Sequence, residues 1–99
     1  INLVLKLRLS VISFNKALQI LDEQEIELFL IVAKSKTKKE IYRKGFKNAD
    51  PYDSESWRII NLLESLNLIK VHRDDVTYSV LFFECLVPEA VMNETLNLE

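Results

Sequence analysis

The side chains that most often carry out catalysis or bind metals are scarce in this chain. Its 99 residues include one histidine, His72, and one cysteine, Cys85. Two such ligands are too few for a structural zinc site within the chain. We expect His72 at the surface or edge of a strand. Cys85 has apolar neighbours, so we expect a small buried group rather than a nucleophile.

No other arrangement of residues indicates an enzyme. No serine stands near the histidine in a recognisable nucleophile pattern, and the single glycine, Gly45, excludes a glycine-rich loop that cradles phosphate. The carboxylates Glu23, Glu25 and Glu27 have a structural explanation, because negative charge at the start of a helix favours its dipole. We therefore predict no catalytic residue, no metal site and no cofactor.

Positive charge is the chemistry that the chain does concentrate. More than half of its 13 lysines and arginines fall between residues 34 and 47, where only Glu40 opposes them: Lys34, Lys36, Lys38, Lys39, Arg43, Lys44 and Lys47. Such a cluster can neutralise the phosphates of a nucleic acid, and its plainer interpretation is a solvated face. The net charge of −2 argues against nucleic-acid binding over the whole surface, so this segment must carry any such binding.

Length and composition favour a single domain with one core. A hydrophobic fraction of 48% can fill that core without disulfides, and a lone cysteine fits a reducing, cytoplasmic interior. The longest apolar run, residues 28–33, is too short to cross a bilayer, which needs about 20 residues. The start shows no signal-peptide pattern. Because the chain begins with Ile1 rather than Met, we expect its first residues to be missing or removed.

Alternation and helical spacing predict the N-terminal elements. Residues 1–11 alternate apolar and polar side chains, which predicts a half-buried strand, with a helix as the alternative because leucine is a good helix former. Apolar spacing over residues 10–21 then predicts a short helix. Asp22 and Glu25 match a capping box, which predicts a buried helix from residue 23 to about residue 34.

The basic segment is predicted to form a short helix over residues 38–44. Thr37 and Glu40 match a capping box at its start. Gly45 is expected to end the helix in the left-handed conformation. Residues 47–53 then form a polar turn.

A third helix is predicted over residues 54–66, with Asp53 or Ser54 as its N-cap. Its apolar residues recur at helical spacing and face a core: Ile59, Leu62, Leu63 and Leu66. The opposite arc is polar apart from one tryptophan: Ser54, Trp57, Arg58, Asn61, Glu64 and Ser65. Asn67 tolerates the left-handed conformation that is needed where the helix gives way to a strand.

A hairpin and a terminal helix complete the chain. Two β-rich segments, residues 68–72 and 76–82, are separated by the three residues 73–75, which predicts a tight turn. Pro88 suits the first turn of a last helix that contains Ala90, Val91 and Leu96. The predicted fold is therefore mainly α with a small β-hairpin, of the α+β class.

The order of long helix, short basic helix, turn, third helix and hairpin resembles the winged helix-turn-helix superfamily. The resemblance covers roughly residues 23–82, with residues 1–21 and 83–99 as extensions of a single domain. Its most informative part is the run from Leu63 to Ile69, followed by the hairpin. Most such folds bind DNA. The resemblance implies a sequence-specific double-stranded DNA-binding protein, a small transcriptional regulator of a prokaryote, archaeon, plasmid or virus.

The resemblance also implies roles for individual residues. The part of the third helix that reads the major groove is occupied by Ser54, Glu55, Trp57, Arg58 and Asn61. In this position Arg58 matches a guanine edge and Asn61 an adenine edge. The DNA backbone would be contacted by the basic residues Lys36, Lys38, Lys39, Arg43 and Lys44. Arg73 would lie at the tip of the wing.

Other interpretations stay open for several of these residues. Trp57 also suits a core position, and Arg58 also suits a bridge to Glu55 or Glu64. The acidic residues that follow Arg73 favour a second function, in which the fold is a protein–protein interaction module of a larger assembly. The basic second helix favours DNA binding, which we place first. We keep the interaction module as the second function, because a fold resemblance alone is a weak warrant for function.

The two ends of the chain predict a homodimer. Residues 1–21 and 82–98 carry many apolar side chains that a small core has limited surface to bury, so those faces need a partner. A two-fold contact between copies would place two recognition helices side by side, about 34 Å apart on a palindromic site.

Overall fold

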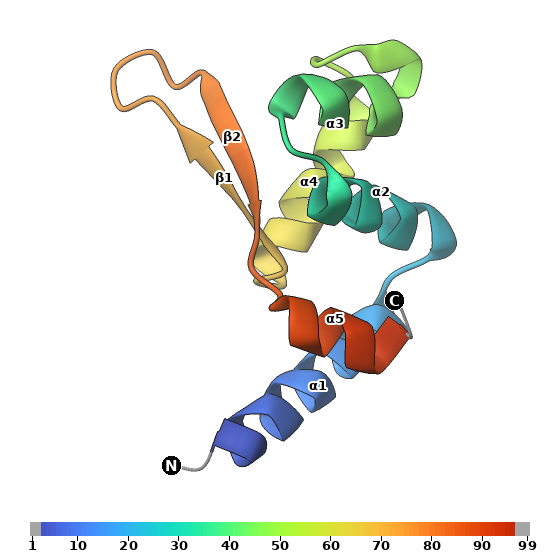
Figure 1. The fold of residues 1–99 in the computed structure, drawn as a ribbon. Helices are drawn as coiled ribbons and strands as arrows, with labels where there is room; N and C mark the ends of the chain where they lie inside the picture. Colours follow the sequence, from blue (N-terminus) through green and yellow to red (C-terminus); the bar gives the residue numbers. More distant parts are fainter. Residues whose placement is uncertain (1–2, 97–99) are drawn as a thin grey trace.

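The computed structural model describes residues 3–96 and contains, in this part, five α-helices, one short 3-10 helix and two strands. Their order is α1 (Leu3–Ile20), α2 (Glu23–Lys34), α3 (Lys38–Gly45), η1 (Lys47–Ala49), α4 (Ser54–Ser65), β1 (Ile69–Arg73), β2 (Val80–Cys85) and α5 (Glu89–Leu96). Helices α2, α3 and α4 lie together with the hairpin beside them, and α1 and α5 pack at the other end (Figure 1). The predicted α+β class is confirmed.

The N-terminal segment is a helix and not the predicted strand. Helix α1 runs without interruption from Leu3 to Ile20, so the short helix expected over residues 10–21 is its second half. Leucine, lysine and arginine favour helices, and the packing of α1 on α5 stabilises the helix. Residues 1 and 2, which the strand prediction also covers, lie outside the described residues.

The predicted starts of α2 and α3 are confirmed by their caps. Asp22 Oδ1 accepts from the backbone N–H of Glu25 at 2.8 Å, and Glu25 Oε1 accepts from the backbone N–H of Asp22 at 2.9 Å. At α3 only half of the expected box forms. Thr37 Oγ1 accepts from the backbone N–H of Glu40 at 3.2 Å, but the Glu40 carboxylate accepts from the backbone N–H of Lys36 at 3.4 Å.

Gly45 is the last residue of α3 and does not have the left-handed conformation expected for it. A Cβ at this position would overlap Leu28 Cδ1 of α2, so glycine here allows two helices to approach closely. The left-handed residues of this segment are Asn48, with φ 58°, and Ala49, with φ 56°. Both belong to η1, within the predicted polar turn.

Helix α4 begins and ends close to the predicted positions. Of the two expected N-caps, Asp53 is the one used: its Oδ2 accepts from the backbone N–H of Ser56 at 2.9 Å and from the Ser56 hydroxyl at 2.8 Å. These bonds lower the pKa of Asp53 and hold it as a carboxylate. Asn67 has φ 61° and is the left-handed residue predicted after the helix.

The predicted antiparallel hairpin is present, but the expected three-residue turn is wrong. Ile69 pairs with Cys85 and Val71 with Phe83, and the register is irregular at Arg73. Strand β2 begins at Val80, later than the sequence pattern indicates, so the connection spans residues 74–79.

Hydrogen bonds to Asp74 explain the longer loop. Its Oδ2 accepts from the backbone N–H of Thr77 at 2.8 Å and of Val76 at 3.0 Å, and these bonds lower the pKa of Asp74. The backbone N–H of Tyr78 donates to the Asp74 carbonyl oxygen at 3.0 Å. Tyr78 has φ 59°, a left-handed conformation that costs a residue other than glycine about 1–3 kcal/mol.

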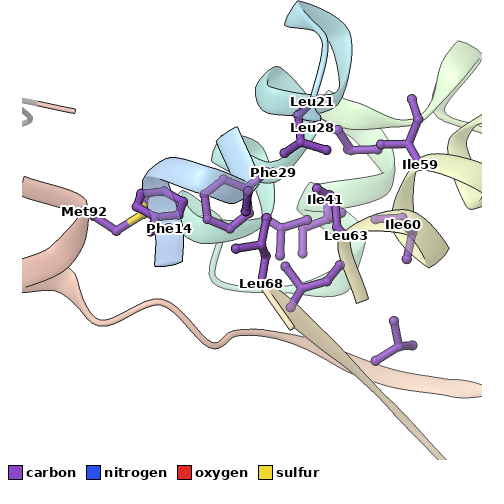
Figure 2. Packing of buried hydrophobic residues seen from close by; sticks show 14 of the residues in the cluster. Phe14, Leu21, Leu28, Phe29, Ile41, Ile59, Ile60, Leu63, Leu68 and Met92 are labelled. Carbon is purple, nitrogen blue, oxygen red and sulfur yellow. The ribbon is translucent and has the colours of Figure 1, made fainter. Parts of the chain in front are cut away.

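One hydrophobic core connects the five α-helices and β1 (Figure 2). Its least exposed side chains are Phe29, Ile41, Ile59, Ile60, Leu63, Ile69 and Val91. The α4 residues Ile59 and Leu63 are buried as predicted, while Leu62 and Leu66 are half-buried. The expected terminal helix forms as α5, and its Val91 joins the core. Among the described helices, none is long and apolar enough to cross a membrane.

Candidate nucleic-acid interface

Helix α3 is amphipathic and turns its basic side chains outward. Ile41 is buried in the core and fixes the inner face. The five basic residues assigned to the DNA backbone are all exposed: Lys36, Lys38, Lys39, Arg43 and Lys44. The structure therefore places the sequence-predicted cations on one exposed segment, which consists of α3 and the turn before it.

These cations differ in how they are held. Lys44 Nζ forms an ion pair with Glu40 Oε1 at 2.8 Å, which lowers the pKa of Glu40. Lys38 Nζ donates to the backbone carbonyl oxygen of Val80 at 2.7 Å and links α3 to the hairpin. Within residues 3–96 no ion pair involves Lys36, Lys39 or Arg43. We call these three residues the α3 patch.

Helix α4 exposes the first part of its predicted arc. Ser54, Glu55, Arg58 and Asn61 are exposed, and Ser65 lies farther along the helix. Glu64 is half-buried, and its Oε2 accepts from the backbone N–H of Val71 at 3.1 Å. The acidic residue at the end of the arc therefore supports the hairpin.

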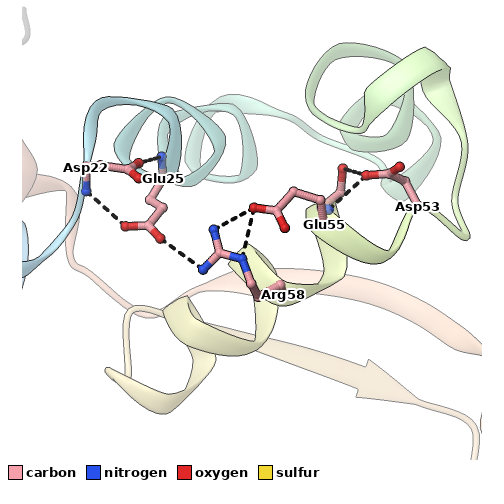
Figure 3. A network of polar contacts seen from close by, with 6 residues as sticks. Asp22, Glu25, Asp53, Glu55 and Arg58 are labelled. Atoms are coloured by element: carbon pink, nitrogen blue, oxygen red, sulfur yellow. Dashed lines mark hydrogen bonds and ion pairs between the residues drawn. The ribbon is translucent and has the colours of Figure 1, made fainter.

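Arg58 is the centre of a polar network that joins α4 to α2 (Figure 3). Its Nε and Nη2 donate to Glu55 Oε1 at 2.9 and 2.6 Å, and its Nη1 lies 3.4 Å from Glu25 Oε2. The bonds from Arg58 lower the pKa of Glu55. Of the two bridges expected for Arg58, the structure has the one to Glu55; the contact with buried Glu25 is additional. The sequence pattern indicated a place for Glu25 at the start of α2, in the cap and at the helix dipole, and no contact with Arg58.

Trp57 is half-buried and does not lie on the exposed arc of α4. Its ring packs on Phe46 and Phe83, with centroid distances of 5.5 and 5.9 Å, and its Nε1 donates to the Pro51 carbonyl oxygen at 2.6 Å. The core interpretation of Trp57 is therefore closer to the structure than a place on the surface that reads the major groove. The helical wheel misplaced this residue because it ignores the hairpin on that side of α4.

Arg73 lies beside Trp57 and not at the tip of the hairpin. It is the last residue of β1, and its guanidinium carbon is 5.7 Å from the centroid of the Trp57 ring. The tip is formed by residues 74–79, which contain both aspartates. Arg73 is therefore closer to the helices than the sequence indicated.

A groove of about 500 Å³ separates the hairpin from α3 and α4. Its lining residues come from all three elements and from the loop after η1: Lys38, Tyr42, Pro51, Tyr52, Trp57, Arg73, Tyr78, Ser79 and Val80. Burial raises the pKa of Tyr42, so its hydroxyl stays protonated. The sequence pattern did not indicate this groove. The available signal was two tyrosines, Tyr52 and Tyr78, in polar loops that have no core to bury them.

His72 and Cys85, the two residues first considered for catalysis or metal binding, make contacts that belong to the fold. His72 Nε2 lies 2.8 Å from Glu84 Oε1, and its ring stacks on Phe82 at 4.1 Å. Cys85 is half-buried, and burial raises its pKa, which disfavours the reactive thiolate. Within residues 3–96 no three His, Cys, Asp or Glu side chains gather closely enough to hold a metal ion.

Comparison of the chain with protein-family models, with curated proteins and with solved structures found no match.

Proposed function

We propose that this chain is a winged helix-turn-helix protein that binds double-stranded DNA and acts as an intracellular transcriptional regulator. In this arrangement α3 lies along the sugar-phosphate backbone, α4 enters the major groove, and the hairpin is the wing. The observation that carries the proposal is the α3 patch. It exposes three cations that have no carboxylate partner in the described part of the chain, and the first part of α4 is exposed as well.

The residues of α4 differ in their readiness to contact bases. The side chains of Ser54 and Asn61 are exposed and have no hydrogen-bond partner among the described residues. Arg58 must exchange its bonds to Glu55 for a base edge, so the free protein holds it in a competing ion pair. Asn61 therefore meets an adenine edge at lower cost than Arg58 meets a guanine edge.

Salt dependence of DNA binding tests the proposal. In fluorescence anisotropy with a labelled mixed-sequence duplex, binding should weaken steeply as salt rises, because neutralised phosphates release counterions. Replacing Lys36, Lys39 and Arg43 by alanine should weaken binding to all sequences and reduce the log–log salt slope by up to about 0.9 for each phosphate that is no longer neutralised. Arg58→Ala should instead relax the preference for a selected site.

The matched control removes three exposed cations outside the α3 patch: Lys6, Arg8 and Lys70. It changes the net charge by the same amount but leaves the α3 patch intact. An equal loss of affinity in both triple variants would assign the effect to net charge. No binding of the wild-type protein at low salt would contradict DNA binding altogether.

A specific observation favours the second candidate, a protein–protein interaction module. The Arg58 guanidinium is already bonded to Glu55 and Glu25, and the hairpin tip carries aspartates where a DNA-binding wing needs cations. In that case α4 would present a polar surface to a partner protein. Failure to bind DNA in the salt titration, together with retained folding, would favour this function.

We also propose that the protein is a homodimer. The two predicted extensions pack on each other as α1 and α5, and this packing buries part of their apolar surface. Leu9, Ile12 and Ile20 of α1 remain exposed, and a second copy can cover them. Leu98, at the end of the predicted dimer contact, lies outside the described residues.

A further inference from the structure

We propose that the groove between the hairpin and helices α3 and α4 binds single-stranded nucleic acid. Bases would stack on Tyr52 and Tyr78, and backbone phosphates would pair with Lys38 and Arg73. This site deepens the proposed function, because it adds a preference for unpaired nucleotides to the duplex contacts of the α3 patch. Two observations support it, and together they indicate the class of ligand.

The first observation is that two aromatic side chains at the groove are exposed without benefit to the core. Tyr52 is 87% exposed and Tyr78 is 74% exposed, yet both line the groove. Tyr78 also has the left-handed φ described above, which the hydrogen bonds around Asp74 maintain. The loop hydrogen bonds explain the backbone conformation but not the choice of a large exposed ring at this position, and strained residues gather at binding sites.

The second observation is the charge of the groove. Its lining includes the cations Lys38 and Arg73 and no carboxylate. Neither cation forms an ion pair in the part of the chain that the structure describes. The nearby carboxylates of Asp50, Asp53 and Asp74 accept hydrogen bonds within their own turns. The groove therefore suits an anion.

The combination of rings and cations in one groove indicates the class of ligand. Aromatic cages without cations bind methylated ammonium groups, but Lys38 and Arg73 would repel such a ligand. Stacking surfaces beside cations match a base attached to a phosphate, which is the repeating unit of a nucleic acid. In a duplex the bases are stacked on one another, so only unpaired bases can use these rings.

Four measurements test the site with the full chain. Labelled 15-mers of thymidine and of uridine, and a duplex of mixed sequence, are titrated by fluorescence anisotropy, with Trp57 emission recorded for the unlabelled strands. Both single strands should bind and quench Trp57, which is the only tryptophan and lines the groove. A difference between the two strands identifies DNA or RNA as the favoured source.

Variants separate this site from the α3 patch. Replacing Tyr52 and Tyr78 by leucine should weaken single-strand binding about fivefold or more for each ring and leave duplex binding within about twofold. Replacement of both by phenylalanine should preserve binding. Phe82→Leu removes another exposed ring of the hairpin that does not line the groove, and it should have no effect.

The proposal is overturned if the wild-type chain does not bind either single strand at low salt, or if the leucine variant binds them as tightly as the wild type. Equal losses of single-strand and duplex binding in that variant would also overturn it. The alanine variant of the α3 patch should lose affinity for the duplex, whereas the leucine variant of the groove should lose affinity for the single strands. The two proposals are therefore distinguishable.

Discussion

Arg58 and Trp57 are neighbours on α4, but the structure uses them in different ways. Arg58 is exposed, and its ion pair with Glu55 lies at the surface, where such contacts add little to stability, whereas its second partner, Glu25, is buried. Trp57 joins α4 to Phe46, directly after α3, and to the hairpin through ring contacts, and to the loop after η1 through one hydrogen bond. The pair between Arg58 and Glu55 can therefore be exchanged at a lower cost than the ring contacts of the tryptophan, which is part of the scaffold.

Gly45 offers a test of close packing between helices. Alanine in a helix favours stability by about 0.5–1 kcal/mol over glycine. Here its Cβ would overlap Leu28, which is buried, and overpacking costs about 1–3 kcal/mol. Gly45→Ala should therefore lower the free energy of unfolding, as measured by urea denaturation. An increase in stability would show that Leu28 can move aside.

Elements with a strong local signal were predictable from the sequence. The capping box of Asp22 and Glu25, and the left-handed Asn67, fixed the ends of α2 and α4 because each uses a short-range hydrogen bond or backbone preference. The alternation of apolar and polar residues at the N-terminus led to the wrong prediction of a strand, because the helix propensity of a leucine-rich segment competes with a period of two. Tertiary packing, which the local pattern does not contain, decides the outcome through the fit of α1 on α5.

The candidate site was predictable only for the residues that lie together on a single helix. The cations of α3 follow directly from a basic, capped helix. The groove requires Lys38, Tyr52, Trp57 and Arg73 to come together from segments far apart in the sequence. These residues come together because of the long hairpin loop and η1. In η1, Asn48 and Ala49 have a left-handed backbone conformation although neither is a glycine. No periodicity in the sequence reports such geometry.

The hairpin loop should respond to pH through Asp74. Hydrogen bonds from Thr77 and Val76 lower the pKa of Asp74, so the folded loop favours the charged carboxylate. Its contribution to stability is therefore present above the ordinary pKa of an aspartate and is lost as the pH falls through the lowered folded value. Amide hydrogen exchange at Thr77 and Tyr78 should accelerate at low pH, relative to the intrinsic rate.

Asp74→Ala should show the faster exchange already at neutral pH. Asp75 follows it in the same loop and accepts no hydrogen bond in the described part of the chain, so Asp75→Ala is the matched control. Equal exchange rates in the Asp74 variant and the wild type would contradict the assigned role of this carboxylate.

At the scale of the whole molecule, α1 has one buried side and one side with exposed apolar residues. Its inner side buries Phe14 and Ala17, while Leu9, Ile12 and Ile20 are 56%, 51% and 66% exposed on the other side. Leu9, Ile12 and Ile20 fall on one stripe at helical spacing. The first half of α1 also extends beyond α5 (Figure 1), so it is accessible to a second copy.

The homodimer should therefore dissociate when this stripe becomes charged. Light scattering at micromolar concentration should give the mass of two chains for the wild type and of one chain for Leu9→Lys combined with Ile12→Lys. Asn15→Lys, an exposed α1 change outside the stripe, is the control and should leave the dimer intact. Because two copies present two α4 helices, the dimer should also prefer a palindromic duplex with half-sites about 34 Å apart, and the charged variant should lose that preference before it loses general DNA binding. A wild-type mass of one chain would exclude the dimer and, with it, the palindromic site.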